Sequence, residues 1–122
     1  MTAQLQAVEA FRAYAEKITG QPVTVGLLPK EGGIAAQVVT GSREFTSLDL
    51  ANRRAALSLD VLAKNRKQEQ AYGALCEIAN ACDSARLGAP VINAGVRSEP
   101  LFVGRDGDYW IYSLSVSLRV MI

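Results

Sequence analysis

The side chains that most often carry out catalysis or bind metals are scarce in this chain of 122 residues, which contains two cysteines and no histidine. Histidine is the usual general base near neutral pH, the usual partner of a nucleophilic serine or cysteine, and the commonest transition-metal ligand. Cys76 and Cys82 lie in a segment predicted as one helix, where a turn of ~100° per residue points them about 240° apart and prevents a mutual disulfide. We expect both to be reduced and to fill space in or near the core.

Glycines and carboxylates gather where the chain is expected to turn. The glycine-rich segments are Gly32-Gly33 and residues 104–107, and neither follows a strand and opens a helix, as a phosphate-binding loop must. Asp106 and Asp108 lie at the tip of a predicted hairpin, where acidic residues are common for the turn itself. We therefore expect no catalytic residue, no metal site and no cofactor site, and we predict that the chain is not an enzyme.

Two groups of basic residues lie at opposite ends of the third predicted strand, Arg53 and Arg54 at its start and Lys64, Arg66 and Lys67 at its end. In the simplest interpretation they are solvated strand ends. Alternatively, they face DNA or a protein partner in a ring, because a modest local charge becomes large when several copies face one channel. The net charge of the chain is only +1, which argues against a broad positive surface. The sequence leaves both interpretations open.

The last fourteen residues alternate between apolar and polar side chains, which predicts a long β-strand with one buried face. At ~3.3 Å per residue this strand would extend for ~45 Å, whereas a compact chain of this length has an equivalent sphere only ~35 Å across. We therefore expect the strand to bend sharply or to find cover on another molecule. Trp110 and Tyr112 fall on the buried face, where a core role is favoured over an interface anchor. The residues expected to contact a neighbouring subunit are Tyr109, Ile111, Arg119, Met121 and Ile122.

Helical and strand periods predict the remaining elements. Thr2 is a candidate N-cap of the first helix and Gly20 its stop, while Asn65 is a candidate cap of the second helix. Gly73 lies inside the second helix, where either close packing or simple tolerance explains a glycine. The expected elements are helix 2–19, strand 23–27, strand 34–40 ended by Gly41-Ser42, a loop over 43–52, a third strand containing residues 54–61, helix 65–82, a loop over 83–95, strand 96–103 and strand 109–122.

The order of these elements predicts an α+β fold, a mainly antiparallel five-stranded sheet with two helices packed on one face in the order α-β-β-β-α-β-β. The first two strands are expected to form a hairpin with a loose loop, and Asp106-Gly107 a two-residue turn before the last strand. With 49% hydrophobic and 20% charged residues, residues 1–122 are expected to form one domain. The chain has no apolar run of membrane length and no signal peptide, so we expect a cytosolic protein without membrane contact.

Three features combine in roughly the last two thirds of the chain, a strand end, the buried stripe of a helix and a closing hairpin. Their residues are Ala63-Lys64-Asn65, then Gln68, Ala71, Leu75 and Ile78, and finally Pro100, Val103-Gly104 and Tyr109 to Tyr112. In combination they resemble the tail-terminator family of long-tailed bacteriophages, whose members are also called minor capsid or tail-completion proteins. The segment from Gly41 to Asn52 gives no matching motif.

The resemblance implies a structural virion protein without an active site or cofactor. Copies of the chain would form a homo-hexameric ring on the last ring of tail-tube protein, end tube polymerisation and offer the surface that joins the tail to the head-tail connector. DNA would pass through the lumen without sequence-specific binding. The implied location is the head-proximal end of the tail, and the host cytoplasm during assembly.

Two alternatives stay open. One is a head-completion or neck connector protein, which would bind heads rather than tail ends. The other, from a different class, is a small dimeric α+β ligand-binding module or enzyme. A pocket lined by Tyr72, Tyr109 and Trp110 would favour this second alternative.

Overall fold

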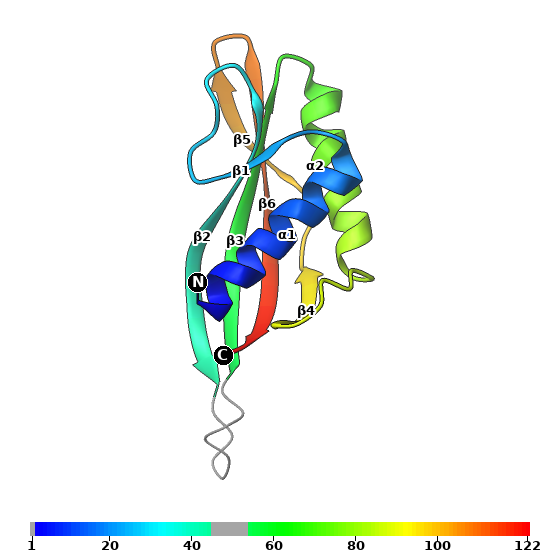
Figure 1. Cartoon of the computed structure of the whole chain (residues 1–122). Helices are drawn as coiled ribbons and strands as arrows, with labels where there is room; N and C mark the ends of the chain where they lie inside the picture. Colours follow the sequence, from blue (N-terminus) through cyan, green and yellow to red (C-terminus); the bar gives the residue numbers. More distant parts are fainter. Residues whose placement is uncertain (1, 45–53) are drawn as a thin grey trace.

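The described part of the chain folds into two helices and a six-stranded mixed sheet (Figure 1). This computed structural model describes residues 2–44 and 54–122. The α+β class and the two helices are confirmed, whereas the predicted count of five strands and an order ending in two strands is wrong. The elements are α1 (Ala3–Thr19), β1 (Val23–Val25), β2 (Gly33–Glu44), β3 (Arg54–Asn65), α2 (Gln68–Cys82), β4 (Val91–Val96), β5 (Leu101–Asp106) and β6 (Tyr109–Met121).

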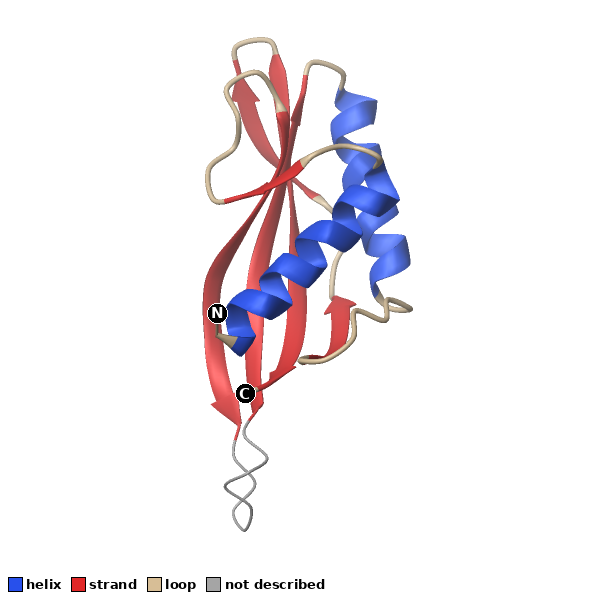
Figure 2. Cartoon of the chain, viewed as in Figure 1, coloured by secondary structure: helices blue, strands red, loops and turns tan. Residues whose placement is uncertain are grey.

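Both helices lie on the same face of the sheet (Figure 2). α1 begins and ends as predicted, because the Thr2 hydroxyl accepts a hydrogen bond from the Leu5 amide at 3.2 Å and Gly20 closes the helix in the left-handed conformation. The buried stripe of α2 consists of the five residues expected from the sequence. These are Ala71, Ala74, Leu75, Ile78 and Cys82.

The predicted cap of α2 is wrong by two residues. Lys67 occupies the N-cap position without a side-chain cap, and the Asn65 carboxamide oxygen accepts a hydrogen bond from the Lys67 amide at 2.9 Å. Gln68 does not reach back to Asn65. Its amide group donates to the Tyr112 hydroxyl at 2.7 Å, which ties the first turn of α2 to β6.

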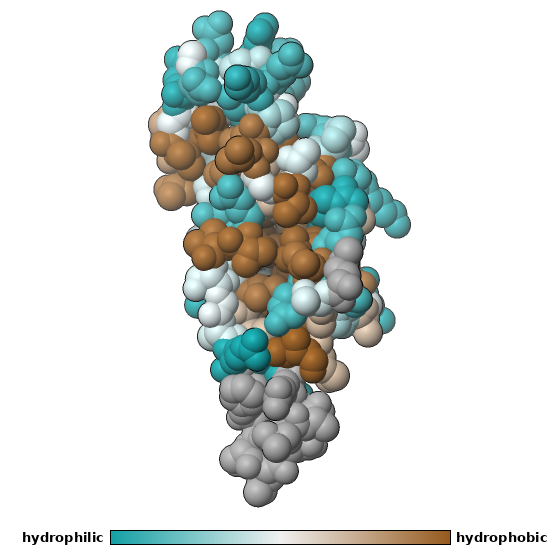
Figure 3. Space-filling model, turned by 60° about the vertical axis from the view of Figure 1, so that its left-hand side comes forward, coloured by the Kyte–Doolittle hydropathy of each residue, from teal (hydrophilic) through white to brown (hydrophobic). Residues whose placement is uncertain are grey.

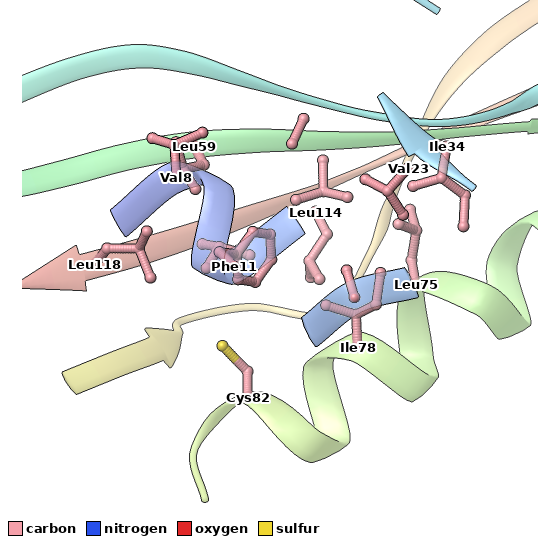
Figure 4. Packing of buried hydrophobic residues seen from close by; sticks show 14 of the residues in the cluster. Val8, Phe11, Val23, Ile34, Leu59, Leu75, Ile78, Cys82, Leu114 and Leu118 are labelled. Carbon is pink, nitrogen blue, oxygen red and sulfur yellow. The ribbon is translucent and has the colours of Figure 1, made fainter. Parts of the chain in front are cut away.

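The core lies between the helices and the central strands β3 and β6 (Figure 4). Phe11 of α1 and Leu75 and Ile78 of α2 are almost fully buried against this sheet face. Leu114 and Leu118 of β6 enter the same cluster from the opposite side. Each such side chain contributes ~1.5–3 kcal/mol through removal of apolar surface from water. The alternation of apolar and polar residues in the last strand therefore correctly predicted which of its faces is buried.

β6 is a central strand, so the expectation that it bends sharply or needs cover from another molecule is wrong. β3 pairs antiparallel along its length, from Arg54↔Met121 to Asn65↔Trp110. On its other edge β6 pairs with β5 near its start and with β4 near its end. Two short strands in series thus share one long partner, which lets the strand stay extended inside its own chain.

The predicted hairpin of the first two strands is also wrong, because β1 pairs with β2 in parallel, from Val23↔Ile34 to Val25↔Ala36. The intervening residues 26–32 return the chain to the level at which β1 begins, so that β2 can run parallel to β1. The Gly26 amide donates to the Ala36 carbonyl at 3.0 Å. The Glu16 carboxylate of α1 accepts from the Val23 amide at 3.0 Å and so fixes the start of β1.

Strand ends elsewhere differ from the expected ones. β2 continues through Gly41-Ser42, which pair with Leu57 and Ala56 of β3 beyond a bulge between Val38 and Thr40. Residues 83–95 are not all loop, since β4 occupies Val91–Val96. The expected strand 96–103 is split at Pro100, which has no N–H to donate to a ladder, and β5 begins at the next residue.

The β5–β6 hairpin has a two-residue turn, as predicted, but Gly107 and Asp108 occupy its central positions. Only Gly107 has a positive φ, of 59°, so the turn requires glycine at the first central position alone. The register therefore moves by one residue from the predicted Asp106-Gly107 turn.

Candidate functional site

The groups capable of covalent or metal chemistry stay apart in the described part of the chain. Residues 2–44 and 54–122 contain no cluster of three or more cysteine, aspartate or glutamate side chains able to hold a metal ion. Cys82 is buried, and this burial raises the pKa of its thiol to about 11, so the thiolate is scarce at neutral pH. Cys76, half-buried on α2, is also a free cysteine. In the same ranges, neither helix is long and apolar enough to cross a membrane.

The structure does not form the pocket that would favour a ligand-binding module. Successive residues of a strand point to opposite faces, so Tyr109 lies on the helix-free face and Trp110 on the helix-bearing face. Tyr72 contacts Tyr112, with ring centroids 5.4 Å apart, on the helix-bearing face. The three residues named for that pocket therefore line no common site.

The five predicted contact residues of β6 lie at its two ends. Tyr109 and Ile111 are half-buried near the hairpin, whereas Arg119 and Met121 are exposed at the other end, all four on the helix-free face. Ile122 packs against the core cluster. The four residues on the helix-free face form two separate pairs, and Ile122 belongs to neither.

The predicted basic residues are also dispersed. Arg53 lies outside the described residues, and Arg54 is half-buried at the first position of β3. Lys64, near the other end of β3, is only 7% exposed and its ammonium lies 2.8 Å from the Asp106 carboxylate. Arg66 and Lys67 are exposed in the turn before α2.

A cationic cluster surrounds Tyr109 at the hairpin end of the helix-free face. The Lys64 ammonium lies 5.0 Å, and the Arg66 guanidinium 5.3 Å, from the centroid of the Tyr109 ring. The hydrogen bond and charge of Lys64 lower the pKa of Asp106. The backbone at Gly32 packs closely here, because an added Cβ would lie 2.9 Å from the Lys64 carbonyl oxygen. Lys64 therefore joins the β5–β6 hairpin to β3 and offers little free charge.

The middle of the helix-free face is lined by small hydroxyl side chains. They surround a shallow depression of about 310 Å³ that also includes Arg97. The hydroxyl residues at this depression are Thr40, Ser42, Ser58, Ser115 and Ser117. We call these five residues the serine-rich surface.

One outer edge of the sheet, which the sequence did not indicate, belongs to β2. β1 pairs with residues 34–36 only, and beyond them β2 has no partner on that side among the described residues. Val38 and Val39, at the bulge, are 48% and 56% exposed. Figure 3 turns this side toward the viewer and shows groups of hydrophobic side chains on it. We call the segment Gln37–Arg43 the β2 edge.

The second outer edge belongs to β5, which pairs only with β6 among the described residues. Leu101, Phe102 and Val103 are 70%, 48% and 55% exposed. Phe102 continues into an aromatic row, because its ring lies 5.8 Å from Trp110 and 5.5 Å from Tyr112. We call Leu101–Asp106 the β5 edge. The three consecutive apolar residues directly after Pro100 are the feature of the sequence from which this edge could have been predicted, but the sequence analysis did not use it.

The comparisons with known proteins show a fold and no family. No protein-family model matches the chain, and no curated protein matches it. A solved chain from the virion of a native gene transfer agent particle is similar in fold, with a TM-score of 0.55 at 18% identity over 97% of this chain and 95% of that chain. A second solved structure, without a functional description, has a TM-score of 0.55 at 15% identity over 100% of this chain and 98% of the other.

Proposed function

We propose that this protein is a structural subunit of a phage-like virion that forms a ring on the end of the tail tube. The observation that carries the proposal is the fold similarity to a virion chain, which spans nearly the whole of both chains. The resemblance of the strand end, helix stripe and closing hairpin to the tail-terminator family points in the same direction.

The proposed mechanism is steric. A closed ring satisfies its subunit contacts with copies of itself, so a ring that binds the tube end and presents a different upper face prevents further tube protein from adding. The β2 edge and the β5 edge supply surface for such contacts, because both carry exposed apolar side chains. In this proposal the hexamer binds tail-tube protein on one face and the head-tail connector on the other, and no covalent bond changes.

The serine-rich surface suits the lumen of the ring. Its small hydroxyl groups are uncharged, and Lys64 at one end of the same face is paired with Asp106. Arg97 is a basic side chain at the depression, and a surface that is otherwise lined by uncharged hydroxyl groups binds passing DNA weakly, since phosphate contacts from basic side chains supply most non-specific affinity. DNA would therefore pass without sequence-specific binding.

A tube-growth experiment tests this function. Isolated tail tubes are incubated with soluble tube protein, with or without this chain, and tube lengths are measured by electron microscopy. We expect growth to stop when the chain is present. Continued growth at saturating concentrations of the chain would contradict the proposal.

The head-completion alternative is a second candidate, because similarity to a chain of a virion particle supports a role in the head as well as in the tail. It predicts that the purified chain sediments with isolated heads and leaves tube growth unchanged. The terminator proposal predicts the reverse distribution, with the chain in the tail fraction.

A further inference from the structure

A depression of about 320 Å³ lies on the helix-bearing face where the start of α2 meets β6, and it is lined by Gln68, Glu69, Tyr72 and Tyr112. The ring of Phe102, on β5, packs beside that of Tyr112. We call these five residues the aromatic depression. We propose that the aromatic depression binds a basic side chain, arginine or lysine, of a segment of a partner protein. The inference does not depend on the ring or the tail tube.

The first argument is the arrangement of the aromatic rings. The buried ring of Tyr112 has its centroid 5.4 Å from that of Tyr72 and 5.5 Å from that of Phe102, and its plane is inclined to theirs by 60° and 61°. Tyr72 and Phe102 are both exposed. A cation within about 6 Å of a ring centroid is attracted by the negative face of the ring. The aromatic depression therefore offers ring surface to a cation from more than one side chain.

The second argument is a cation that the chain itself places on the same row of rings. The Arg105 guanidinium lies 4.4 Å from the centroid of the Trp110 ring, and this ring lies 5.8 Å from that of Phe102. Arg105 occupies the hairpin end of the row, and Phe102 and Tyr72 continue the row toward α2. A basic side chain in the aromatic depression would make with Tyr72 the contact that Arg105 makes with Trp110.

The third argument is charge, which favours a basic over an apolar side chain. Glu69 lines the depression. The pKa of the Tyr72 hydroxyl is raised, first by a hydrogen bond with Cys76 and further by the negative charge of Glu99, so a second carboxylate lies near this ring. An apolar side chain would shield Glu69 from water without offering it a donor, which costs free energy. A guanidinium or ammonium donates to a carboxylate and contacts the rings at the same time.

The fourth argument concerns the kind of partner. Pockets for small molecules have volumes of ~300–1,000 Å³, so this depression is at the lower limit and suits a single side chain. Its floor is already fixed, because the Gln68 amide donates to the Tyr112 hydroxyl at 2.7 Å. A free amine would gain this one contact only. A protein segment would also cover the exposed apolar side chains of Leu101 and Val103 on β5, which adds to its affinity.

Peptide binding tests the site. The probe is acetyl-Gly-Arg-Gly-amide, and the matched probe contains citrulline, which keeps the shape of arginine without its charge. Both are titrated to high millimolar concentration, and the ring protons of Tyr72, Tyr112 and Phe102 are followed by NMR. We expect saturable shifts with the arginine peptide and an affinity at least about fivefold lower for the citrulline peptide.

Single variants locate the binding. Glu69→Gln removes the carboxylate and Tyr72→Leu the ring, and each should weaken binding of the arginine peptide about three- to tenfold. The matched control is Glu77→Gln, an exposed carboxylate of the same helix that does not line the depression, and it should bind like the wild type. Circular dichroism of each variant excludes loss of folding as the cause.

Four outcomes would overturn the inference. Equal affinity for the citrulline peptide would show that the depression takes neutral segments. Absence of ring-proton shifts would show that no basic side chain binds there. Equal weakening by Glu69→Gln and Glu77→Gln would indicate diffuse attraction to the helix. Ring-proton shifts that follow the concentration of the chain alone would assign the depression to a second copy.

The result is separable from the proposed function. If the arginine peptide binds and tubes still grow, the site stands and the terminator role is contradicted. If tube growth stops and the peptide does not bind, the role stands and this inference is wrong.

Discussion

At the scale of single residues, the contact between Lys64 and Asp106 gives both side chains a role that the sequence did not predict. Lys64 was a candidate DNA-facing cation and Asp106 a turn residue, yet the structure joins them at 2.8 Å across 42 positions of sequence. A pairing over such a separation depends on which strands are neighbours. No local spacing in the sequence contains that information.

We predict that Asp106→Asn lowers stability at neutral pH and flattens the acid limb of the stability curve. Lys64 lowers the pKa of Asp106 in the folded chain, so the stabilisation is present above the carboxyl's unfolded pKa and is lost as pH falls through the lower folded pKa. Urea unfolding at several pH values measures this. Asp108→Asn in the same turn is the control, because the structure describes no ion pair of Asp108 with residues 2–44 or 54–122. Identical acid limbs for wild type and Asp106→Asn would contradict the prediction.

Gly32 gives a second residue-scale prediction. Its φ of +91° and its close approach to Lys64 and Tyr109 both exclude a side chain, so Gly32→Ala should lower the free energy of unfolding by ~1–3 kcal/mol. Gly104→Ala is the control, since nothing lies within 4 Å of its added methyl group. Denaturant unfolding distinguishes them, and equal stabilities for the two variants would show that Gly32 is not constrained.

At the scale of elements, periodicity predicted what packs against the core. The buried stripe of α2, the first helix with its two caps, and the buried face of β6 all follow from local spacing. The parallel pairing of β1 and the short strand β4 were missed, because a three-residue strand and a half-exposed one carry little period. Pro100 did mark the boundary between β4 and β5, and the predicted strand 96–103 ran through it.

Gly73 in α2 decides between the two explanations left open by the sequence. No atom lies within 4 Å of an added Cβ, so the glycine is tolerated rather than required for close packing. Gly73→Ala should therefore raise the free energy of unfolding by roughly 0.5–1 kcal/mol, the difference in helix propensity. Thermal unfolding checks this, and a destabilised variant would reveal packing that the structure does not show.

The two sheet edges give a prediction about assembly. Lysine on an outer strand opposes pairing with another strand, so Val39→Lys and Val103→Lys should each abolish self-association while the monomer stays folded. Ser115→Lys, on the serine-rich surface, should associate like the wild type. Sedimentation over a range of concentrations measures the difference, and association of both edge variants at wild-type strength would rule out these edges.

At the scale of the whole molecule, the structure gives a different physical reason for expecting contact between copies from the one that the sequence suggested. The sequence suggested that the last strand was too long for its own domain, but β3, β4 and β5 complete both its edges. In our proposal, contact with a neighbouring copy involves the open edges of β2 and β5 instead. These edges exist only once all six strands are in order, which is why the predicted contact residues on β6 did not include them.

Electron microscopy of isolated tail tubes mixed with the purified chain tests the central claim most directly. Class averages viewed along the tube axis should show added rings with sixfold symmetry at one end of each tube, built from copies of this chain. Bare tube ends at saturating concentrations of the chain, or density bound only to heads, would contradict it.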